Sequence, residues 1–101
     1  MIKATTKVYV LLRKTILKSS YESGVAGVFS DLDMAMDFAY QVINGIQTAD
    51  NSRKFVYDEP PQDRYNKNVK FRLIQTTTEL PRFVFECTEE ILLTHEPKEA
   101  E

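Results

Sequence analysis

The sequence predicts an α+β domain in which a single helix packs on one face of an antiparallel sheet of four to five strands, in the order β-β-α-β-β-β. Three patterns carry this prediction: a β-branched and aromatic stretch over 5–18, an amphipathic helical pattern from residue 31, and alternating stretches over 69–76 and 82–88. Since no shift in composition divides the chain, we expect one domain spanning residues 1–101.

The first expected strand, residues 5–18, contains neither Pro nor Gly and is rich in residues that favour strands. Turn-forming residues follow over 19–24, and a short strand over 25–29 then predicts a hairpin. Because the charges of the first strand fall on one set of alternate positions, we expect that set to face outward. The outward set is Lys7, Tyr9, Leu11 and Arg13, and the set expected in the core is Val8, Val10 and Leu12.

The clearest local signal is the start of a helix at Ser30-Asp31-Leu32-Asp33. Ser30 is the predicted N-cap, and Asp33 completes an aspartate variant of the capping box. Gly45 is the candidate C-cap. We therefore expect a helix over about 31–44, with an inner stripe made of Ala35, Phe38, Ala39, Val42 and Ile43.

The second half of the chain predicts three more strands. Residues 53–57 are a short strand candidate, and the two alternating stretches over 69–76 and 82–88 are typical of an antiparallel hairpin. Residues 58–68 read DEPPQDRYNKN; two prolines and no aliphatic residue indicate an exposed loop. Residues 96–101 predict a polar tail.

Composition argues against several classes of protein. The chain has 13 basic and 15 acidic residues and a net charge of −2, whereas dedicated nucleic-acid binders usually carry a basic excess. Cys87 is the only cysteine, so no disulfide can form within the chain. No apolar run approaches the roughly 20 residues that a membrane span needs. We therefore expect a cytoplasmic protein without a membrane partner.

Residues that usually perform catalysis or bind metals are sparse. His95 is the only histidine, and the sequence around it supplies no nucleophile or orienting group. Cys87 falls on the expected core face of its strand, which favours a buried structural thiol. A solvated helix face explains Asp31, Asp33 and Asp37 better than a metal site does. The sequence thus predicts no catalytic residue, no metal site and no cofactor.

Charge is distributed unevenly along the chain, and this points to a protein partner. The net charge is +4 over 1–30, −4 over 31–50, +3 over 51–75 and −5 over 76–101. Such segregation can steer association with a charged protein. We predict a protein-binding surface on the face of the sheet away from the helix, comprising Lys7, Tyr9, Leu11, Arg13, Lys70, Arg72 and Arg82, together with the loop residues Asp58, Glu59, Asp63, Arg64 and Tyr65.

Other functions remain open at this point. The same basic and aromatic face could bind nucleic acid, or a small molecule could bind in a pocket at a dimer interface. An enzyme is the weakest interpretation. Homodimerisation is a further expectation, because the long first strand can leave an exposed edge and Leu11, Ile74 and Val84 would leave apolar groups on the open face.

Two segments near the N-terminus share a pattern with known proteins: KVYVLL at 7–12 and YESGVAGVFSDLDMAMDFA at 21–39. They resemble the opening of many short phage and prophage proteins, which also run from a strand through a loop and a GVFSD-like strand end into a helix. The resemblance covers roughly residues 1–45. It implies a small phage accessory protein that binds a host protein and modulates or inhibits it, and no functional residue carries over.

Overall fold

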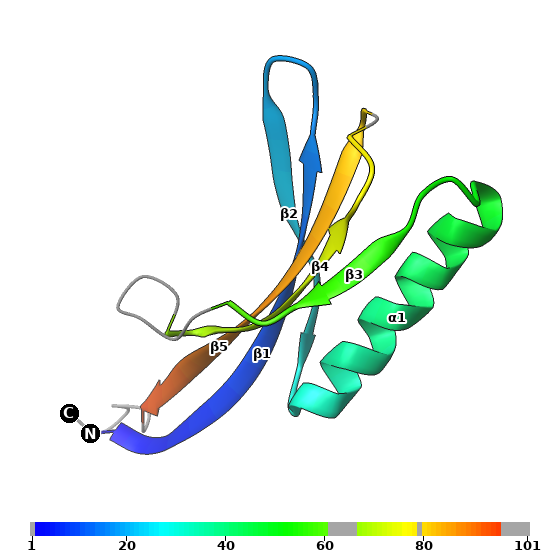
Figure 1. Ribbon diagram of the computed structural model, residues 1–101. Helices are drawn as coiled ribbons and strands as arrows, with labels where there is room; N and C mark the ends of the chain where they lie inside the picture. The colour runs from blue at the N-terminus through cyan, green and yellow to red at the C-terminus, as the bar shows by residue number, and fades with distance from the viewer. Residues whose placement is uncertain (1, 61–66, 79, 96–101) are drawn as a thin grey trace.

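The computed structural model describes residues 2–60, 67–78 and 80–95. Within these ranges the chain forms one helix and five strands (Figure 1). They are β1 (Ile2–Ile16), β2 (Tyr21–Phe29), α1 (Leu32–Ala49), β3 (Phe55–Asp58), β4 (Val69–Gln75) and β5 (Arg82–His95). The strands make one antiparallel sheet in the order β2-β1-β5-β4-β3, and α1 packs on one face of it. The predicted fold class and order of elements are confirmed.

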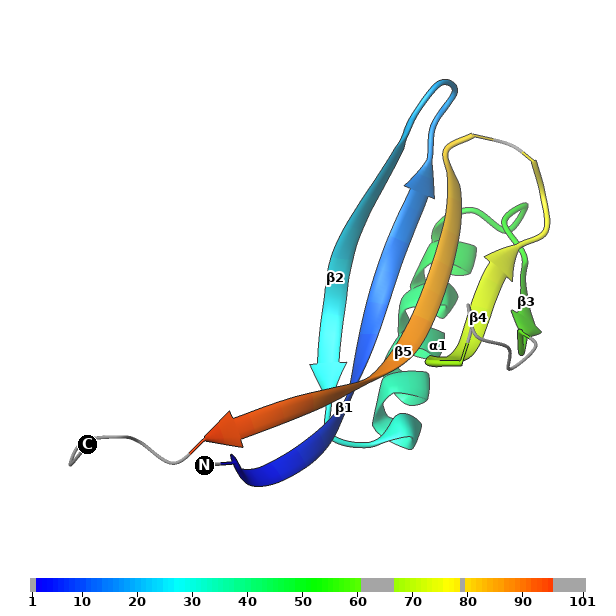
Figure 2. The ribbon, with the colours of Figure 1, turned by 90° about the vertical axis from the view of Figure 1, so that its left-hand side faces the viewer.

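Strands β1 and β5 form the long central pair of the sheet. Their ladder runs from Ile2 opposite His95 to Ile16 opposite Arg82. Two-stranded arms project past the helix in both directions, the β1–β2 hairpin on one side and the outer part of the β1–β5 ribbon on the other (Figure 2). These arms explain a radius of gyration of 16.6 Å, against about 13 Å for a compact domain of this length.

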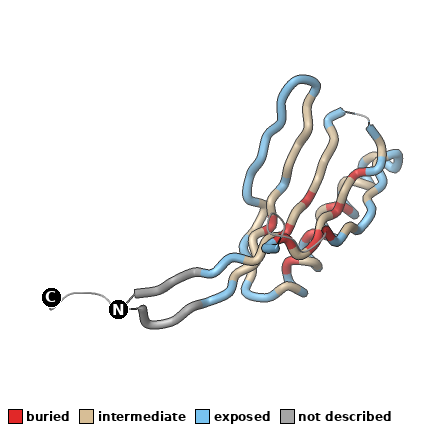
Figure 3. The backbone as a smooth tube through the Cα atoms, turned by 60° about the vertical axis from the view of Figure 1, so that its left-hand side comes forward, coloured by how far each residue is buried: buried red, intermediate tan, exposed pale blue. Residues whose placement is uncertain are grey.

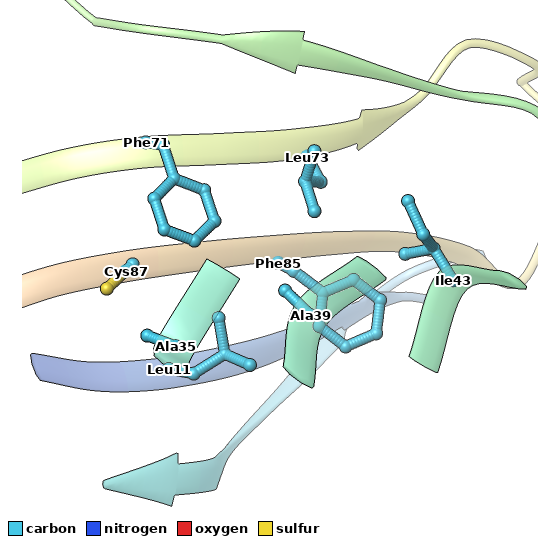
Figure 4. Packing of buried hydrophobic residues seen from close by; sticks show 8 residues of the cluster. All are labelled: Leu11, Ala35, Ala39, Ile43, Phe71, Leu73, Phe85 and Cys87. Atoms are coloured by element: carbon cyan, nitrogen blue, oxygen red, sulfur yellow. The ribbon is translucent and has the colours of Figure 1, made fainter. Parts of the chain in front are cut away.

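The core lies where α1 faces the middle of the sheet, and exposed residues predominate along the hairpin arm (Figure 3). Ala35 and Ala39 are fully buried on the helix. Their small side chains let the helix approach the sheet closely, so the rings of Phe71 and Phe85 fill the space between the two layers (Figure 4). The buried cluster consists of Leu11, Ala35, Ala39, Ile43, Phe71, Leu73, Phe85 and Cys87.

The start of α1 differs by one residue from the prediction. Asp31 is the N-cap in place of Ser30, and its Oδ1 accepts a hydrogen bond of 2.8 Å from the backbone N–H of Met34. Serine and aspartate are equally good N-caps, so the sequence pattern could not choose between neighbours. Phe38, predicted in the inner stripe, lies at the margin of the core with its ring centre 5.4 Å from that of Phe29.

The end of α1 lies five residues beyond the predicted position. The helix passes through Gly45, which does not adopt a left-handed conformation, and continues to Ala49. Asp50 closes it by donating its backbone N–H to the carbonyl of Ile46 at 2.9 Å. The predicted C-cap at Gly45 is therefore wrong. Glycine marks many helix ends, but it also occurs inside helices whose neighbouring residues sustain the pattern.

The predicted faces of β1 are reversed. Leu11 is fully buried beneath α1, and Tyr9 packs against the core. The side chains of Val8, Val10 and Leu12 therefore point to the other face, because successive residues of a strand alternate. Apolar residues occur on both faces of β1, so its hydrophobic pattern is ambiguous. The pairing decides the matter, since Leu11 lies opposite the buried Cys87 of β5.

The first turn is shorter than expected. Strand β2 starts at Tyr21, so Gly24, predicted in the turn, lies inside the strand together with Gly27. The turn occupies the preceding residues, where the N–H of Leu17 donates to the carbonyl of Ser20. A Cβ on Gly27 would lie 2.7 Å from a ring atom of Phe29. Glycine at this position therefore makes room for the Phe29 ring.

The predicted loop over 58–68 is shorter than expected at its beginning. Asp58 is the last residue of β3, and Pro60 is buried. Residues 67 and 68 are exposed, as predicted. Residues 61–66 and the tail over 96–101 lie outside the described ranges.

Candidate protein-binding surface

The sheet has a covered face, which packs on α1, and an open face, on which no element lies among the described residues (Figure 2). Strand alternation and register identify the side chains of the open face. Aliphatic residues are the largest group among them, and several are strongly exposed: Val25 by 63%, Val28 by 59% and Val56 by 49%. Its aliphatic residues are Val8, Val10, Leu12 and Ile16 of β1, Val25 and Val28 of β2, Val56 of β3, Ile74 of β4 and Val84 of β5.

Four charged side chains lie across the open face from β3 to β1 in the order Asp58, Arg72, Glu86 and Lys14, which we call the charged row. The first three are level in the register, whereas Lys14 lies opposite Val84, one outward position along β1. Arg72 donates two hydrogen bonds to Asp58 Oδ2, of 3.0 Å from Nε and 2.6 Å from Nη2. Lys14 Nζ lies 3.0 Å from Glu86 Oε2. Arg72 and Glu86 are directly opposite each other in the register of β4 and β5. The signs thus alternate across four adjacent strands, and the row as a whole is neutral.

Three of the predicted binding residues meet around the carboxylate of Glu89. The hydroxyl of Tyr9 donates to Glu89 Oε1 at 3.3 Å, and Lys70 Nζ lies 3.7 Å from the same oxygen. Lys7 Nζ lies 4.0 Å from Glu89 Oε2. Partial burial, together with the negative charge of Glu89, raises the pKa of Tyr9. Lys7 and Lys70 therefore share one carboxylate, although the Lys7 side chain stays 64% exposed, and Tyr9 packs against the core.

The other four predicted sheet residues are divided between the two faces. Leu11 is buried and cannot contact a partner. Arg13 lies on the covered side, with its guanidinium carbon 5.8 Å from the centre of the Phe83 ring. Arg72 belongs to the charged row, and Arg82 Nε donates to a backbone carbonyl of β4 at 3.1 Å. The predicted outward set of β1 is thus wrong, because the strand is reversed and Leu11 is buried, whereas Arg72 lies on the open face as predicted.

The predicted loop residues have different outcomes. Asp58 lies on β3 within the charged row, and Glu59 is exposed directly after it. Asp63, Arg64 and Tyr65 lie outside the described ranges, so their part in a binding surface stays a prediction.

A structural hub that the sequence analysis missed surrounds Arg53. Its guanidinium donates to the Gln75 side-chain oxygen at 3.1 Å and to the backbone carbonyl of Pro81, and it lies 3.3 Å from Asp50 Oδ2. Hydrogen bonds from Ser52 lower the pKa of Asp50, and the Arg53 charge adds to this effect. Gln75 is fully buried. These contacts hold the end of α1 against the β4–β5 hairpin. They join residues that are far apart in the sequence, so no local sequence pattern predicts them.

The described residues offer little for catalysis. Burial raises the pKa of the Cys87 thiol to about 11, although the charge of Lys70 opposes the shift. The thiol is therefore protonated at neutral pH and is a poor nucleophile. No group of three His, Cys, Asp or Glu residues in the described ranges could hold a metal ion. His95 is the last residue of β5.

A shallow hollow of about 300 Å³ lies on the β1–β2 arm. Arg13 and Glu22 are the charged residues along its wall, and both are exposed. Ligand sites usually enclose most of the ligand and contain a few well-placed polar groups. This hollow is open to solvent, so it gives weak support to the small-ligand alternative.

No family model, no curated protein and no solved structure matches this chain. The resemblance of roughly residues 1–45 to short phage proteins therefore stays a prediction. Of the helical residues in the described ranges, none belongs to a helix long and apolar enough to cross a membrane.

Proposed function

We propose that this protein is a non-catalytic protein-binding module whose binding surface is the open face. The observation that carries the proposal is that this face combines nine aliphatic side chains with a charged row whose members are already paired. Exposed aliphatic side chains gathered on one face cost free energy in water, and on a folded protein they commonly mark a site of association.

The same face is poorly suited to nucleic acid. Binding to a phosphate backbone uses basic side chains that replace condensed counterions. On the open face Lys14 and Arg72 are each bonded to a carboxylate, so a phosphate would have to compete with Glu86 and Asp58. Single-stranded binding would in addition use aromatic rings for stacking, whereas Tyr9 packs on the covered side. We therefore favour a protein partner.

Sedimentation of the fluorescently labelled chain in a cell extract tests the proposal. We expect the wild-type chain to sediment faster than its own mass of 11.7 kDa allows. Val28→Glu places a charge at an exposed position of the aliphatic surface, beside Val10 of β1, so this variant should sediment as the single chain. Val25→Glu should behave in the same way.

Met34→Glu is the matched control, because Met34 is also an exposed apolar residue but lies on α1, away from the open face. It should sediment like the wild type. Equal sedimentation of wild type and Val28→Glu would remove the open face as the binding surface.

A further inference from the structure

We infer that the partner of the open face is a second copy of this chain, packed face to face about a two-fold axis. The inference rests on the proposed function and names the partner of the same surface. It is carried by the order of signs in the charged row, which is negative, positive, negative, positive from Asp58 to Lys14.

A two-fold interface places the same patch on both copies, so a surface that associates in this way must complement itself. An axis that runs along the strands and passes between β4 and β5 reverses the charged row. Arg72 then faces Glu86 of the second copy, and Asp58 comes level with Leu12. Lys14 lies one outward position along β1 from Leu12, and its ammonium group reaches back towards this level to contact Glu86. Opposite charges therefore lie next to each other across the interface. A row whose signs were symmetric about its centre would instead meet its own sign at each position.

The aliphatic residues fit the same arrangement. Ile74 and Val84 are opposite each other on β4 and β5, so they lie on either side of the proposed axis. Rotation brings Ile74 of each copy over Val84 of the other. Two sheets packed in this way form an aligned sandwich with about 10 Å between the sheets, which aliphatic side chains fill well.

Pairing through a sheet edge is the competing way to join two copies. The edge strand β3 has four residues and is followed by Pro60, which shortens the available ladder. The edge strand β2 is longer, but its register with β1 shifts between Leu11 and Leu12. Such a bulge twists an edge away from regular pairing. The open face is therefore the better interface.

Charge reversal tests the inference with purified protein, measured by sedimentation equilibrium over a concentration series. The wild type should approach twice the 11.7 kDa of one chain. Arg72→Glu would face Glu86 of an identical copy, and Glu86→Arg would face Arg72. Because like charges in an interface strongly oppose association, each variant alone should dimerise on the order of 100-fold more weakly.

The decisive sample is an equimolar mixture of Arg72→Glu and Glu86→Arg. In the mixed pair the charges at positions 72 and 86 again face opposite charges, so the mixture should form a heterodimer although neither variant forms a homodimer. The double variant should also dimerise with itself. Lys54→Glu and Asp37→Arg change exposed charges elsewhere, and they should leave the wild-type dimer unchanged.

The outcomes separate this inference from the proposed function. A purified wild type that stays monomeric overturns the inference, whereas Val28→Glu sedimentation in extract still decides the proposed function. A wild-type dimer that persists in both charge variants also overturns it and points to an edge. If Arg72→Glu fails to fold, Asp58→Lys and Lys14→Glu provide the same test at the outer positions of the row, alone and mixed.

Discussion

The two faces of this sheet come from the same strands but solve different packing problems. The covered face fills the space under Ala35 and Ala39 with the large rings of Phe71 and Phe85. The open face carries shorter aliphatic side chains, and four of its charges form the charged row. A face that packs on its own helix needs volume to fill the layer. A face that meets a separate molecule also needs a feature that fixes one orientation, and in the proposed dimer the charged row would supply it.

The largest expected difference between the two faces is in the free energy of unfolding after one side chain on each face is truncated. Phe85→Ala should lower the free energy of unfolding by about 3–5 kcal/mol, because it leaves a cavity between helix and sheet. Val28→Ala, at an exposed position on the open face, should change it by at most about 0.5 kcal/mol. Urea denaturation measures both values.

Both substitutions should be made in an Arg72→Glu background, so that association of copies does not contribute to the measured difference. Similar losses at Phe85 and Val28 would show that the open face is packed within the single chain, and the distinction between the faces would disappear.

The two glycines of β2 differ in the space around them. Gly27→Ala places a methyl group 2.7 Å from the Phe29 ring, and we expect a loss of about 1–3 kcal/mol because the ring must move. Gly24→Ala is the matched control in the same strand, with no atom within 4 Å of the added Cβ. It should stabilise by about 0.4–1 kcal/mol through the unfolded chain. Thermal unfolding of the two variants measures the contrast, and equal shifts would contradict it.

A smaller effect concerns the Cys87 thiol at high pH. Burial raises its pKa from an ordinary 9.0 to about 11, so the folded state disfavours the thiolate. The unfolded chain loses this proton first. Stability from this group is therefore complete below pH 9.0 and is lost as the pH rises towards 11. The melting temperature should fall over this interval, and the fall should be smaller in Cys87→Ala. An unchanged slope in the variant would mean that other groups cause it.

The sequence predicted most of the fold because the pattern of several elements allows one interpretation. In β4 the residues Val69, Phe71 and Leu73 alternate with Lys70 and Arg72, so the core face was predicted correctly. The inner stripe of α1 was equally well marked at Ala35, Ala39 and Ile43, all of which are buried.

The candidate surface was harder to predict because it depends on pairing between strands. Leu11 and Leu12 are the same residue type in neighbouring positions, so the pattern of β1 could not decide which one is buried. Asp58 was assigned to a loop because prolines follow it closely. The charged row combines residues from four strands, and only the pairing of these strands brings them together.

The pairing of β1 with β5 also has a kinetic consequence. Residues 2–16 pair with residues 82–95, so the centre of the sheet joins segments separated by most of the chain. The β1–β2 hairpin and α1 are local and can form early, but Leu11 meets Cys87 only after a very long loop closes. During synthesis β1 is made long before β5. Until β5 is available, β1 can pair only with β2, so its other edge lacks backbone hydrogen bonds and apolar side chains on both of its faces are exposed. Folding should be slow for a domain of this size. The partly folded chain, in which β1 has not yet paired with β5, is the state most prone to aggregation.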